Sequence, residues 1–353
     1  MNQAALWRIA TFVIFTALIS ACAQETKTPA AKFTGRVLLL MGEAANGANL
    51  TELTPTDSGP NLSTITGGVL EAVPSPDQTR LLYATKDEVM LRDLHSGVVK
   101  SLIKGENFCL AWSTDGNHFS YKQRSAAGAT KLYEADLNGQ SKLVLEDPNG
   151  STDCARWIAS DRLVFDRFVG TQQKTKPGEL KPNTTTIATV GDAVKLHDTQ
   201  RKWSIESVCP KDNNAFLRAA DQGTLLIAKN IDHFETLDPS PAPCSECRFV
   251  GYAAQSCVPF FIEQPTSTTT ELFYLNPTNW QKQRPGSINR TFSLNARMLV
   301  KSSARLMIVG DAGSLFLIDT ESGEITSLLA ASSSSPDNGR AGNGPVPIVW
   351  IEK

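Results

Sequence analysis

Short runs of apolar residues, separated by polar turns, recur along most of the chain. The stretch from Leu70 to Gly97 shows the arrangement: an apolar run, the turn Ser75-Pro76-Asp77, the run "RLLYA", and another apolar run before a glycine. Runs of this length, bounded by Ser, Pro, Asp and Gly, predict β-strands joined by tight turns. Alternating Leu, Tyr and Val residues within them are expected to face neighbouring sheets. Because long helical periods are absent, the pattern predicts an all-β fold.

The same arrangement repeats further along the chain. Phe108 to Gly139 contains an apolar run, the turn Ser113 to Gly116, the run "HFSYK" and a final run before a glycine. This copy begins about 38 residues after the first, a spacing typical of four-stranded propeller blades. A weaker third copy, Cys154 to Phe168, keeps the aromatic strand and the Ser160-Asp161 turn. Trp112 and Trp157 occupy matching places in the first strands, which predicts packing between blades.

The order of strand, Ser-Pro-Asp or Ser-Thr-Asp-Gly turn, and apolar-aromatic strand resembles the repeat of the TolB-type β-propeller family. The resemblance is good in two repeats and weak in the third. It implies a β-propeller and binding to envelope proteins. No segment matches that family's separate N-terminal α/β domain, so the family's particular partners are not carried over, and the fold alone does not give the function.

Both ends of the predicted domain supply strands that have no blade of their own. "RVLLLMG" and "ANLTELTP" near the front lack an inner partner, and "VPIVWIEK" at the C-terminus is a lone apolar strand. A blade built from both ends would close the ring and leave no open sheet edge. A clear last blade has Asp319 to Gly323 as its hairpin turn. We therefore predict about seven blades, with six as the other count and a β-sandwich or two small β domains as the alternative fold.

The first 32 residues differ from the rest. Arg8 precedes an uncharged apolar run, Ile9 to Ile19, which is shorter than the roughly 20 residues of a membrane-spanning helix and typical of a signal peptide. Ile19-Ser20-Ala21-Cys22 resembles the lipobox of bacterial lipoproteins. This implies cleavage before Cys22, a diacylglycerol on its thiol, and a further acyl chain such as palmitate on the new amino terminus, which together anchor a protein stably. An ordinary secretory signal with a coincidental cysteine is the alternative.

These features predict a lipoprotein signal peptide over residues 1–21, a lipidated tether over 22–32 and a β-propeller over 33–353. The tether is polar and rich in Thr and Ala. An aspartate after the lipidated cysteine retains enterobacterial lipoproteins in the inner membrane, so Ala23 resembles an outer-membrane address. We expect an envelope protein on the outer membrane, facing the periplasm, although exposure at the cell surface stays open.

Charge and motifs exclude several function classes. Lys and Arg number 34 against 36 Asp and Glu, giving a net charge of -2 and no basic excess for nucleic acid. The histidines form no HExxH pair, and no GxSxG or nucleotide-binding glycine loop occurs. Asp77, Asp93, Asp115 and Asp136 recur at turns, where they are expected to cap backbone N–H groups, whereas a catalytic pair is needed only once. No catalytic residue, metal site or cofactor is predicted.

Apart from Cys22, the chain has six cysteines: Cys109, Cys154, Cys209, Cys244, Cys247 and Cys257. An oxidising envelope permits disulfides, and six cysteines allow fifteen pairings, which stay open. The first three lie at or near the start of a presumed first strand, so neighbouring blades could be cross-linked at one end of the channel. For the CxxC of Cys244 and Cys247, a structural disulfide is favoured over a redox pair or a zinc site, because neither βαβ context nor further ligands occur.

One insertion interrupts the blade pattern. Gly170 to Thr185 replaces a tight hairpin turn and carries Lys174, Lys176 and Lys181. Long loops often carry function, so the three lysines are candidates for partner binding, with a solvated loop of no consequence as the alternative. We predict a lipid-anchored, non-enzymatic propeller that binds an envelope protein or peptide. The rival is an enzyme or small-molecule binder that uses polar groups at the channel mouth.

Overall fold

The computed structural model of the protein describes residues 33–42, 47–124, 129–147, 152–167, 184–191, 193–200, 203–209, 214–219, 225–229, 231, 240–242, 247–253, 257–263, 269–276, 278–292, 296–301, 305–330 and 345–351. The predicted signal peptide and tether, including Cys22, lie outside these residues. Phe33–Lys353 form one unit. Within the described ranges there is no α-helix, and thus no helix long and apolar enough to cross a membrane.

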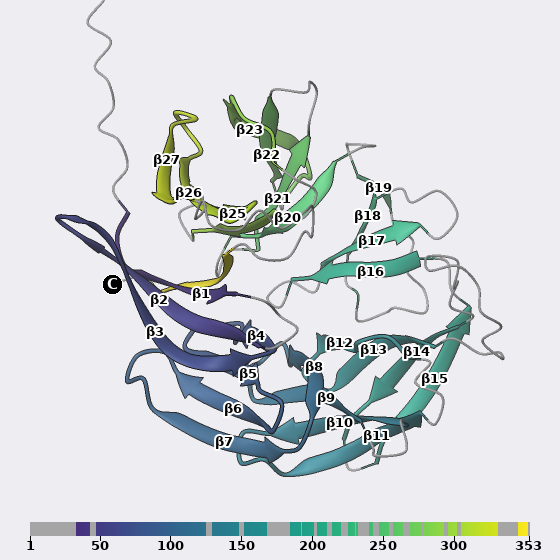
Figure 1. The fold of residues 1–353 in the computed structure, drawn as a ribbon. Helices are drawn as coiled ribbons and strands as arrows, with labels where there is room; N and C mark the ends of the chain where they lie inside the picture. Colours follow the sequence, from purple (N-terminus) through teal and green to yellow (C-terminus); the bar gives the residue numbers. More distant parts are fainter. Residues whose placement is uncertain are drawn as a thin grey trace, which may run out of the picture. The chain divides into compact units, whose positions relative to one another are not determined.

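Seven four-stranded antiparallel sheets form the blades of a ring, which confirms the predicted β-propeller and the count of seven (Figure 1). In blades 2 to 7 the first strand along the chain is the innermost, and the later strands follow outward. Blade 1 comprises β28 (Val346–Ile351), β1 (Arg36–Met41), β2 (Ala48–Thr56) and β3 (Gly59–Val69). Blade 2 comprises β4 (Glu71–Pro74), β5 (Arg80–Ala84), β6 (Glu88–Asp93) and β7 (Val99–Lys104). Blade 3 comprises β8 (Asn107–Trp112), β9 (His118–Arg124), β10 (Thr130–Asp136) and β11 (Ser141–Asp147).

The second half of the ring follows the same plan. Blade 4 comprises β12 (Arg156–Ala159), β13 (Arg162–Arg167), β14 (Thr184–Thr189) and β15 (Lys195–Gln200). Blade 5 comprises β16 (Trp203–Val208), β17 (Ala215–Ala219), β18 (Leu225–Ala228) and β19 (Ser240–Pro241). Blade 6 comprises β20 (Arg248–Tyr252), β21 (Pro259–Glu263), β22 (Thr270–Leu275) and β23 (Lys282–Ile288). Blade 7 comprises β24 (Arg297–Val300), β25 (Leu306–Asp311), β26 (Ser314–Asp319) and β27 (Ile325–Leu329).

The inner strands of the sheets line the centre of the ring. Each inner strand contacts the next one along two series, which are β28, β4, β8, β12, β16 and β20, β24, β28. Every blade runs outward from its inner strand in the same antiparallel order. The N-terminal ends of the inner strands therefore lie at one rim of the ring, and their C-terminal ends lie at the other.

Blade 1 closes the ring with strands from both ends of the domain, as predicted. β28 pairs with β1 from Arg36 opposite Ile351 to Leu40 opposite Val346, and β2 and β3 complete the sheet. The chain entering β28 passes close to blade 7. A Cβ atom added at Gly310 of β25 would lie 1.9 Å from the carbonyl oxygen of Pro345, so only glycine permits this approach.

Hydrophobic clusters fill the spaces between blades. Alternate residues of β5 belong to different clusters: Leu81 and Tyr83 pack with Leu38 and Leu50 of blade 1, whereas Leu82 packs toward blade 3. A blade is covered on both faces, which explains why four consecutive residues of β5 are buried. The expected packing of alternating residues against neighbouring sheets is confirmed.

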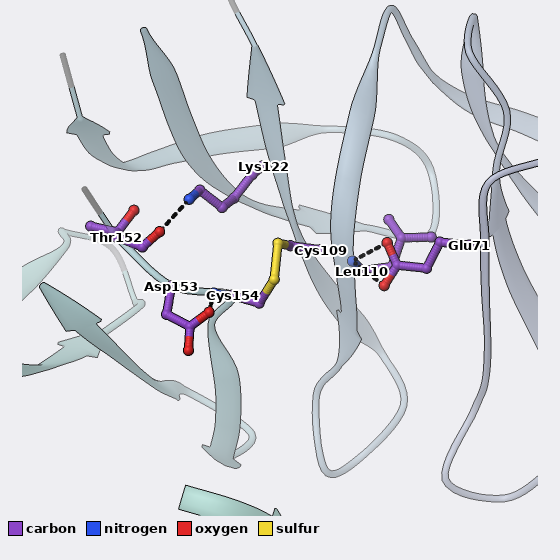
Figure 2. The surroundings of a disulfide bond; sticks show 7 residues. All are labelled: Glu71, Cys109, Leu110, Lys122, Thr152, Asp153 and Cys154. Carbon is purple, nitrogen blue, oxygen red and sulfur yellow. Dashed lines mark hydrogen bonds between the residues drawn. A yellow bond between two sulfur atoms is a disulfide. The ribbon is translucent and has the colours of Figure 1, made fainter. Parts of the chain in front are cut away.

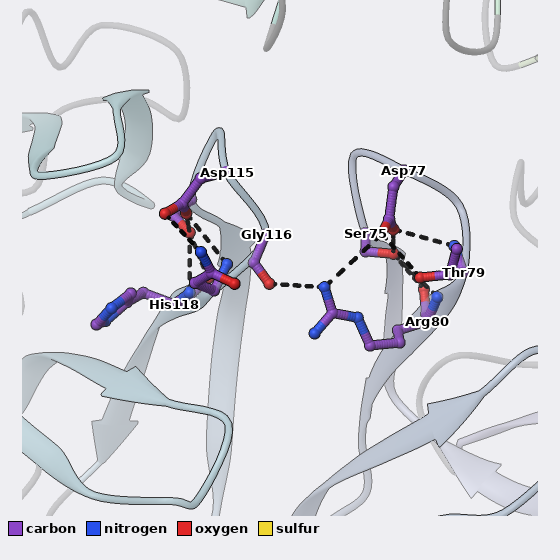
Figure 3. A network of polar contacts seen from close by, with 9 residues as sticks. Ser75, Asp77, Thr79, Arg80, Asp115, Gly116 and His118 are labelled. Carbon is purple, nitrogen blue, oxygen red and sulfur yellow. Dashed lines mark hydrogen bonds and ion pairs between the residues drawn. The ribbon is translucent and has the colours of Figure 1, made fainter.

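The repeated turns are built from side-chain caps on the backbone (Figure 3). In blade 2 the Ser75 hydroxyl donates to Asp77 at 2.5 Å, and Asp77 accepts the N–H of Thr79 at 3.1 Å. In blade 3 the Ser113 hydroxyl donates to Asp115 at 2.6 Å, and Asp115 accepts the N–H of Asn117, also at 3.1 Å. Backbone N–H groups also donate to the carboxylates of Asp93 and Asp136. The predicted capping role of the four aspartates is confirmed.

Side chains also bond one blade to the next. The indole N–H of Trp112 in β8 donates to the carbonyl of Val73 in β4 at 3.0 Å, and that of Trp157 in β12 donates to Ala111 in β8 at 3.1 Å. Arg80 of blade 2 donates to the carbonyl of Gly116 in the blade 3 turn at 2.9 Å (Figure 3). The packing role predicted for the two tryptophans is thus correct, with a hydrogen bond added to each.

Candidate functional site

A cavity of about 530 Å³ lies between blades 3 and 4, where β8 begins and where the chain approaches β12. Its lining comes from β8, from β9 and β10, and from the segment just before β12. The lining residues are Phe108, Cys109, Lys122, Arg124, Thr130, Thr152, Asp153 and Cys154. Because β8 and β12 both start at this point, the cavity lies at the rim of the ring formed by the N-terminal ends of the inner strands.

One wall of the cavity is a disulfide bond between the two blades (Figure 2). Cys109 of β8 is joined to Cys154, two residues before β12, with a Cα–Cα distance of 5.2 Å. Cys109 has a φ of 59°, and the pairing of β8 with β9 shifts register between Phe108 and Ala111. An irregularity of this kind changes the direction of a side chain. Here it directs the side chain of Cys109 toward Cys154, to which it is bonded.

On the side of blade 2, a carboxylate also holds this irregular segment in place. Both oxygens of Glu71 in β4 accept the N–H of Leu110 at 3.2 Å (Figure 2). Burial raises the pKa of Glu71, against the opposing effect of hydrogen bonds from the N–H groups of Leu110 and Cys109. The start of β8 is therefore fixed from both sides, by Glu71 of blade 2 and by Cys154 of blade 4.

Two cations lie together at the cavity. Lys122 of β9 is only 4% exposed, and its ammonium donates to the carbonyl of Thr152 at 2.7 Å. The ammonium of Lys122 and the guanidinium of Arg124 lie 5.7 and 5.5 Å from the centroid of the Phe108 ring. Arg124 also lies 3.7 Å from a carboxylate oxygen of Glu106, and its side chain is 55% exposed. Lys122 is thus the inner cation and Arg124 the outer one.

A hydroxyl and a carboxylate complete the polar lining. Thr130 of β10 is 6% exposed, and its hydroxyl oxygen, buried from water, has no hydrogen-bond partner in the described part of the chain. Asp153 accepts the N–H of Cys154 at 2.8 Å. The lining thus holds two basic side chains and one carboxylate, which favours an anionic ligand.

Cys109, Cys154 and Cys209 were predicted to cluster at one end of the channel, and this is wrong for Cys209. Cys209 follows the last residue of β16 and is joined to Cys257, which follows β20, with a Cα–Cα distance of 5.7 Å. This bond joins blades 5 and 6 at the rim opposite the cavity. The sequence prediction placed Cys209 at or near the start of a first strand, whereas β16 begins at Trp203 and ends at Val208, just before this cysteine.

The other predicted site residues are only partly described. Cys247 is disulfide-bonded, and Cys244 lies outside the described residues. Lys174, Lys176 and Lys181 also lie outside them, between β13 and β14, which pair as antiparallel neighbours. β14 begins at Thr184, so the last two residues of the predicted insertion belong to a strand.

Sequence reasoning missed the polar lining of the cavity. Lys122, Arg124 and Thr130 lie at the paired ends of β9 and β10, and Asp153 lies before β12. One signal was present in the sequence. Lys122 follows Tyr121 in a central strand of a blade, where both faces are covered and a charged residue is rarely buried without a polar partner.

No family model matches the chain, and no curated protein sequence matches it. A functionally unknown protein from Desulfotomaculum acetoxidans DSM 771 is similar in structure, with a TM-score of 0.56 and 10% identity over 88% of this chain and 98% of that one. The β-propeller domain of the Trilobed protease from Pyrococcus furiosus has a TM-score of 0.54 and 12% identity over 86% of this chain and 97% of that one.

TolB from Acinetobacter baumannii is also similar, with a TM-score of 0.42 and 14% identity over 91% of this chain. The chain spans 66% of the length of that TolB chain. At such low sequence identities, these likenesses concern the fold alone, which is that of a β-propeller.

Proposed function

We propose that this protein is a lipid-anchored β-propeller of the bacterial envelope that binds a protein or peptide partner and is not an enzyme. The observation that carries the proposal is the cavity between blades 3 and 4. Its walls are fixed by the Cys109–Cys154 bond, and it presents Lys122 and Arg124 together. A rigid concave site with a few polar groups is typical of binding sites.

The composition of the cavity favours binding over catalysis. Its lining holds one carboxylate, two basic side chains and a hydroxyl, and the described lining residues include no histidine to act as a base beside Thr130. A small-molecule ligand in the same cavity is the second candidate, because a volume of about 530 Å³ falls in the range of small-ligand pockets.

The envelope location rests on the sequence. The apolar run before Ile19-Ser20-Ala21-Cys22 and the small residues next to the cysteine support lipidation at Cys22, and Ala23 supports the outer membrane. Disulfide bonds within the propeller agree with an oxidising compartment.

The test is capture of the partner from the native envelope. Cells that express the lipidated protein are cross-linked and extracted in mild detergent, and stoichiometric co-purifying proteins are identified. We expect one dominant envelope protein, which a Cys22→Ala variant captures less well. Abundant protein without any partner would contradict the proposal and favour the small-molecule alternative.

Two sets of variants locate the contact surface. Arg124→Gln changes the cavity, and the triple change of Lys174, Lys176 and Lys181 to Gln changes the insertion. Lys86→Gln is the matched control, because its side chain is 83% exposed and does not line the cavity. We expect Arg124→Gln to reduce capture and Lys86→Gln to leave it unchanged.

A further inference from the structure

The geometry points to a carboxylate, the free C-terminal carboxylate of a peptide, as the group that binds in the cavity between blades 3 and 4. This inference rests on the proposed function and names the chemistry of the partner. In the bound state Lys122 and Arg124 supply the opposite charge, and Thr130 supplies a hydrogen bond.

The placement of the inner cation, Lys122, favours an anion in the cavity. Lys122 is 4% exposed, so its ammonium has exchanged most of its water for protein groups, among them the Thr152 carbonyl at 2.7 Å. A charge in such a place is weakly screened, and an anion beside it is attracted more strongly than it would be in water. Arg124, which is more exposed, lies on the same Phe108 ring and can meet the anion as it enters.

Thr130 supports a hydrogen-bond acceptor in the cavity, independently of charge. The buried hydroxyl oxygen of Thr130 has no partner among the described residues, and an unsatisfied buried hydroxyl is unfavourable. Thr130 lines the cavity. Rotation about its χ1 angle by about 120° moves the hydroxyl to a different position around the Cα–Cβ bond, and threonine adopts more than one χ1 rotamer. A ligand that accepts a hydrogen bond there would satisfy the hydroxyl.

The remaining lining favours a carboxylate over a more highly charged anion. Asp153 places one negative charge at the same cavity, which opposes a dianionic phosphate more than a monoanionic carboxylate. Asp153 can in addition accept an N–H from the backbone of a peptide. The ring of Phe108 and the disulfide give an apolar wall for the last side chain of the peptide. Capture of a terminal carboxylate is an established mode of peptide recognition.

The experiment uses the full chain in mild detergent and two pools of hexapeptides. One pool has free C-termini, the other has the same sequences with C-terminal amides, and peptides retained by the protein are counted by mass spectrometry. We expect the free acids to be retained at least tenfold more than the amides. Equal retention of the two pools, or no retention from either, would overturn the inference.

Variants tie the binding to the cavity. Arg124→Gln and Lys122→Gln are expected to reduce retention of the free acids at least tenfold, and Thr130→Val about threefold, with Lys86→Gln as the unchanged control. Arg124 is exposed, so its variant remains informative even if Lys122→Gln fails to fold, which the thermal midpoint reports. Unchanged retention by Arg124→Gln would overturn the inference.

Three outcomes distinguish the parts of the inference from one another and from the proposed function. If free amino acids displace the hexapeptides at equal concentration, the cavity binds a small carboxylate and the assignment to a peptide end is wrong. If wild type captures an envelope partner in cells but Arg124→Gln captures it equally, the proposed function holds and the carboxylate assignment fails. If no partner is captured while the free acids are retained, the carboxylate assignment holds and the proposed function fails.

Discussion

The interface between blades 3 and 4 and that between blades 5 and 6 each carry a disulfide, yet the surroundings of the two bonds differ. Beside Cys109–Cys154 lies a cavity lined with charged groups, and Cys154 is exposed. Cys209 and Cys257 are 0% and 7% exposed. Between blades 5 and 6, Phe216 of β17 contacts the rings of Phe249, Tyr252, Phe261 and Trp280 from blade 6, at centroid distances from 5.1 to 6.1 Å.

The two disulfides have different roles in the folded protein. The disulfides close segments with sequence separations of 45 and 48 residues, so their effects on the unfolded chain differ by less than about 0.1 kcal/mol. Any difference between them must arise in the folded state. Between blades 5 and 6 the bond reinforces a packed core, whereas between blades 3 and 4 it holds an open cavity in shape.

The largest expected effect comes from removing each disulfide. Cys209→Ala with Cys257→Ala should lower the free energy of unfolding by about 4 kcal/mol or more, because the loss of the cross-link adds to a loss of buried contacts. Cys109→Ala with Cys154→Ala should cost at least about 1 kcal/mol less, since that site is already open to water. Urea unfolding followed by circular dichroism measures both. Equal losses would remove the distinction between the two interfaces.

The aromatic side chains provide the next test. Phe216→Ala should destabilise the protein by about 3–5 kcal/mol, the usual cost of truncating a fully buried phenylalanine. Phe108→Ala, at the cavity, should cost less than half as much, because the ring is only partly buried. The same unfolding measurement applies. A greater loss for Phe108→Ala would mean that the cavity wall, not the aromatic cluster, is the more tightly packed interface.

A smaller effect is expected for the second link between blades 3 and 4. Trp157→Phe keeps an aromatic ring and removes the hydrogen bond to Ala111, so we expect a loss of about 1 kcal/mol. Combined with loss of Cys109–Cys154, the change measures whether the two links support each other. Coupling near zero would indicate that each link holds a different part of the interface.

The smallest effect concerns the pH dependence of stability at Asp115, in the turn that joins β8 to β9. Partial burial opposes ionisation of Asp115, but hydrogen bonds from Ser113 and Asn117 outweigh it and hold its pKa below the ordinary value. A lowered pKa stabilises the folded state above about pH 4, and this contribution disappears as the pH falls through the folded pKa.

Asp115→Asn should therefore cost a few tenths of a kcal/mol at pH 7, a small value because the side chain is exposed. The difference from wild type should close near pH 2. A constant difference between pH 7 and pH 2, measured by urea unfolding, would show that ionisation of Asp115 has no part in the stability of the turn.

Central strands could be predicted from the sequence more fully than outer strands, and one inner strand, β16, was misplaced. β5 is enclosed between blades and is apolar after Arg80, and β9 carries the buried aromatic residues Phe119 and Tyr121, so their pattern is plain. Most residues of β3 are exposed, and its Gly-, Ser- and Thr-rich sequence does not differ from that of a loop. An outer strand has one sheet neighbour and wide contact with water, so hydrophobicity does not mark it.

The candidate site was missed for a related reason. A cavity is formed by residues from four segments, and only the three-dimensional packing brings Lys122 of β9 to Thr152 before β12. The pairing of Cys109 with Cys154 was among the possibilities left open. The rim of Cys209 was misjudged because the prediction put this cysteine at the start of an inner strand. In the structure β16 ends at Val208, so Cys209 lies at the other end of its strand and therefore at the other rim.

The closure of blade 1 has a consequence for the time course of folding. Trp350 beside β1 donates to the carbonyl of Thr34 across 316 residues of chain. The entropy of closing so large a loop grows only with the logarithm of its length, so the equilibrium cost is modest, but contacts this distant form slowly. Until β28 docks, β1 presents an unpaired inner edge. Ring closure should therefore be the last and rate-limiting step, and the interval before it is when the chain is most exposed to pairing with another molecule.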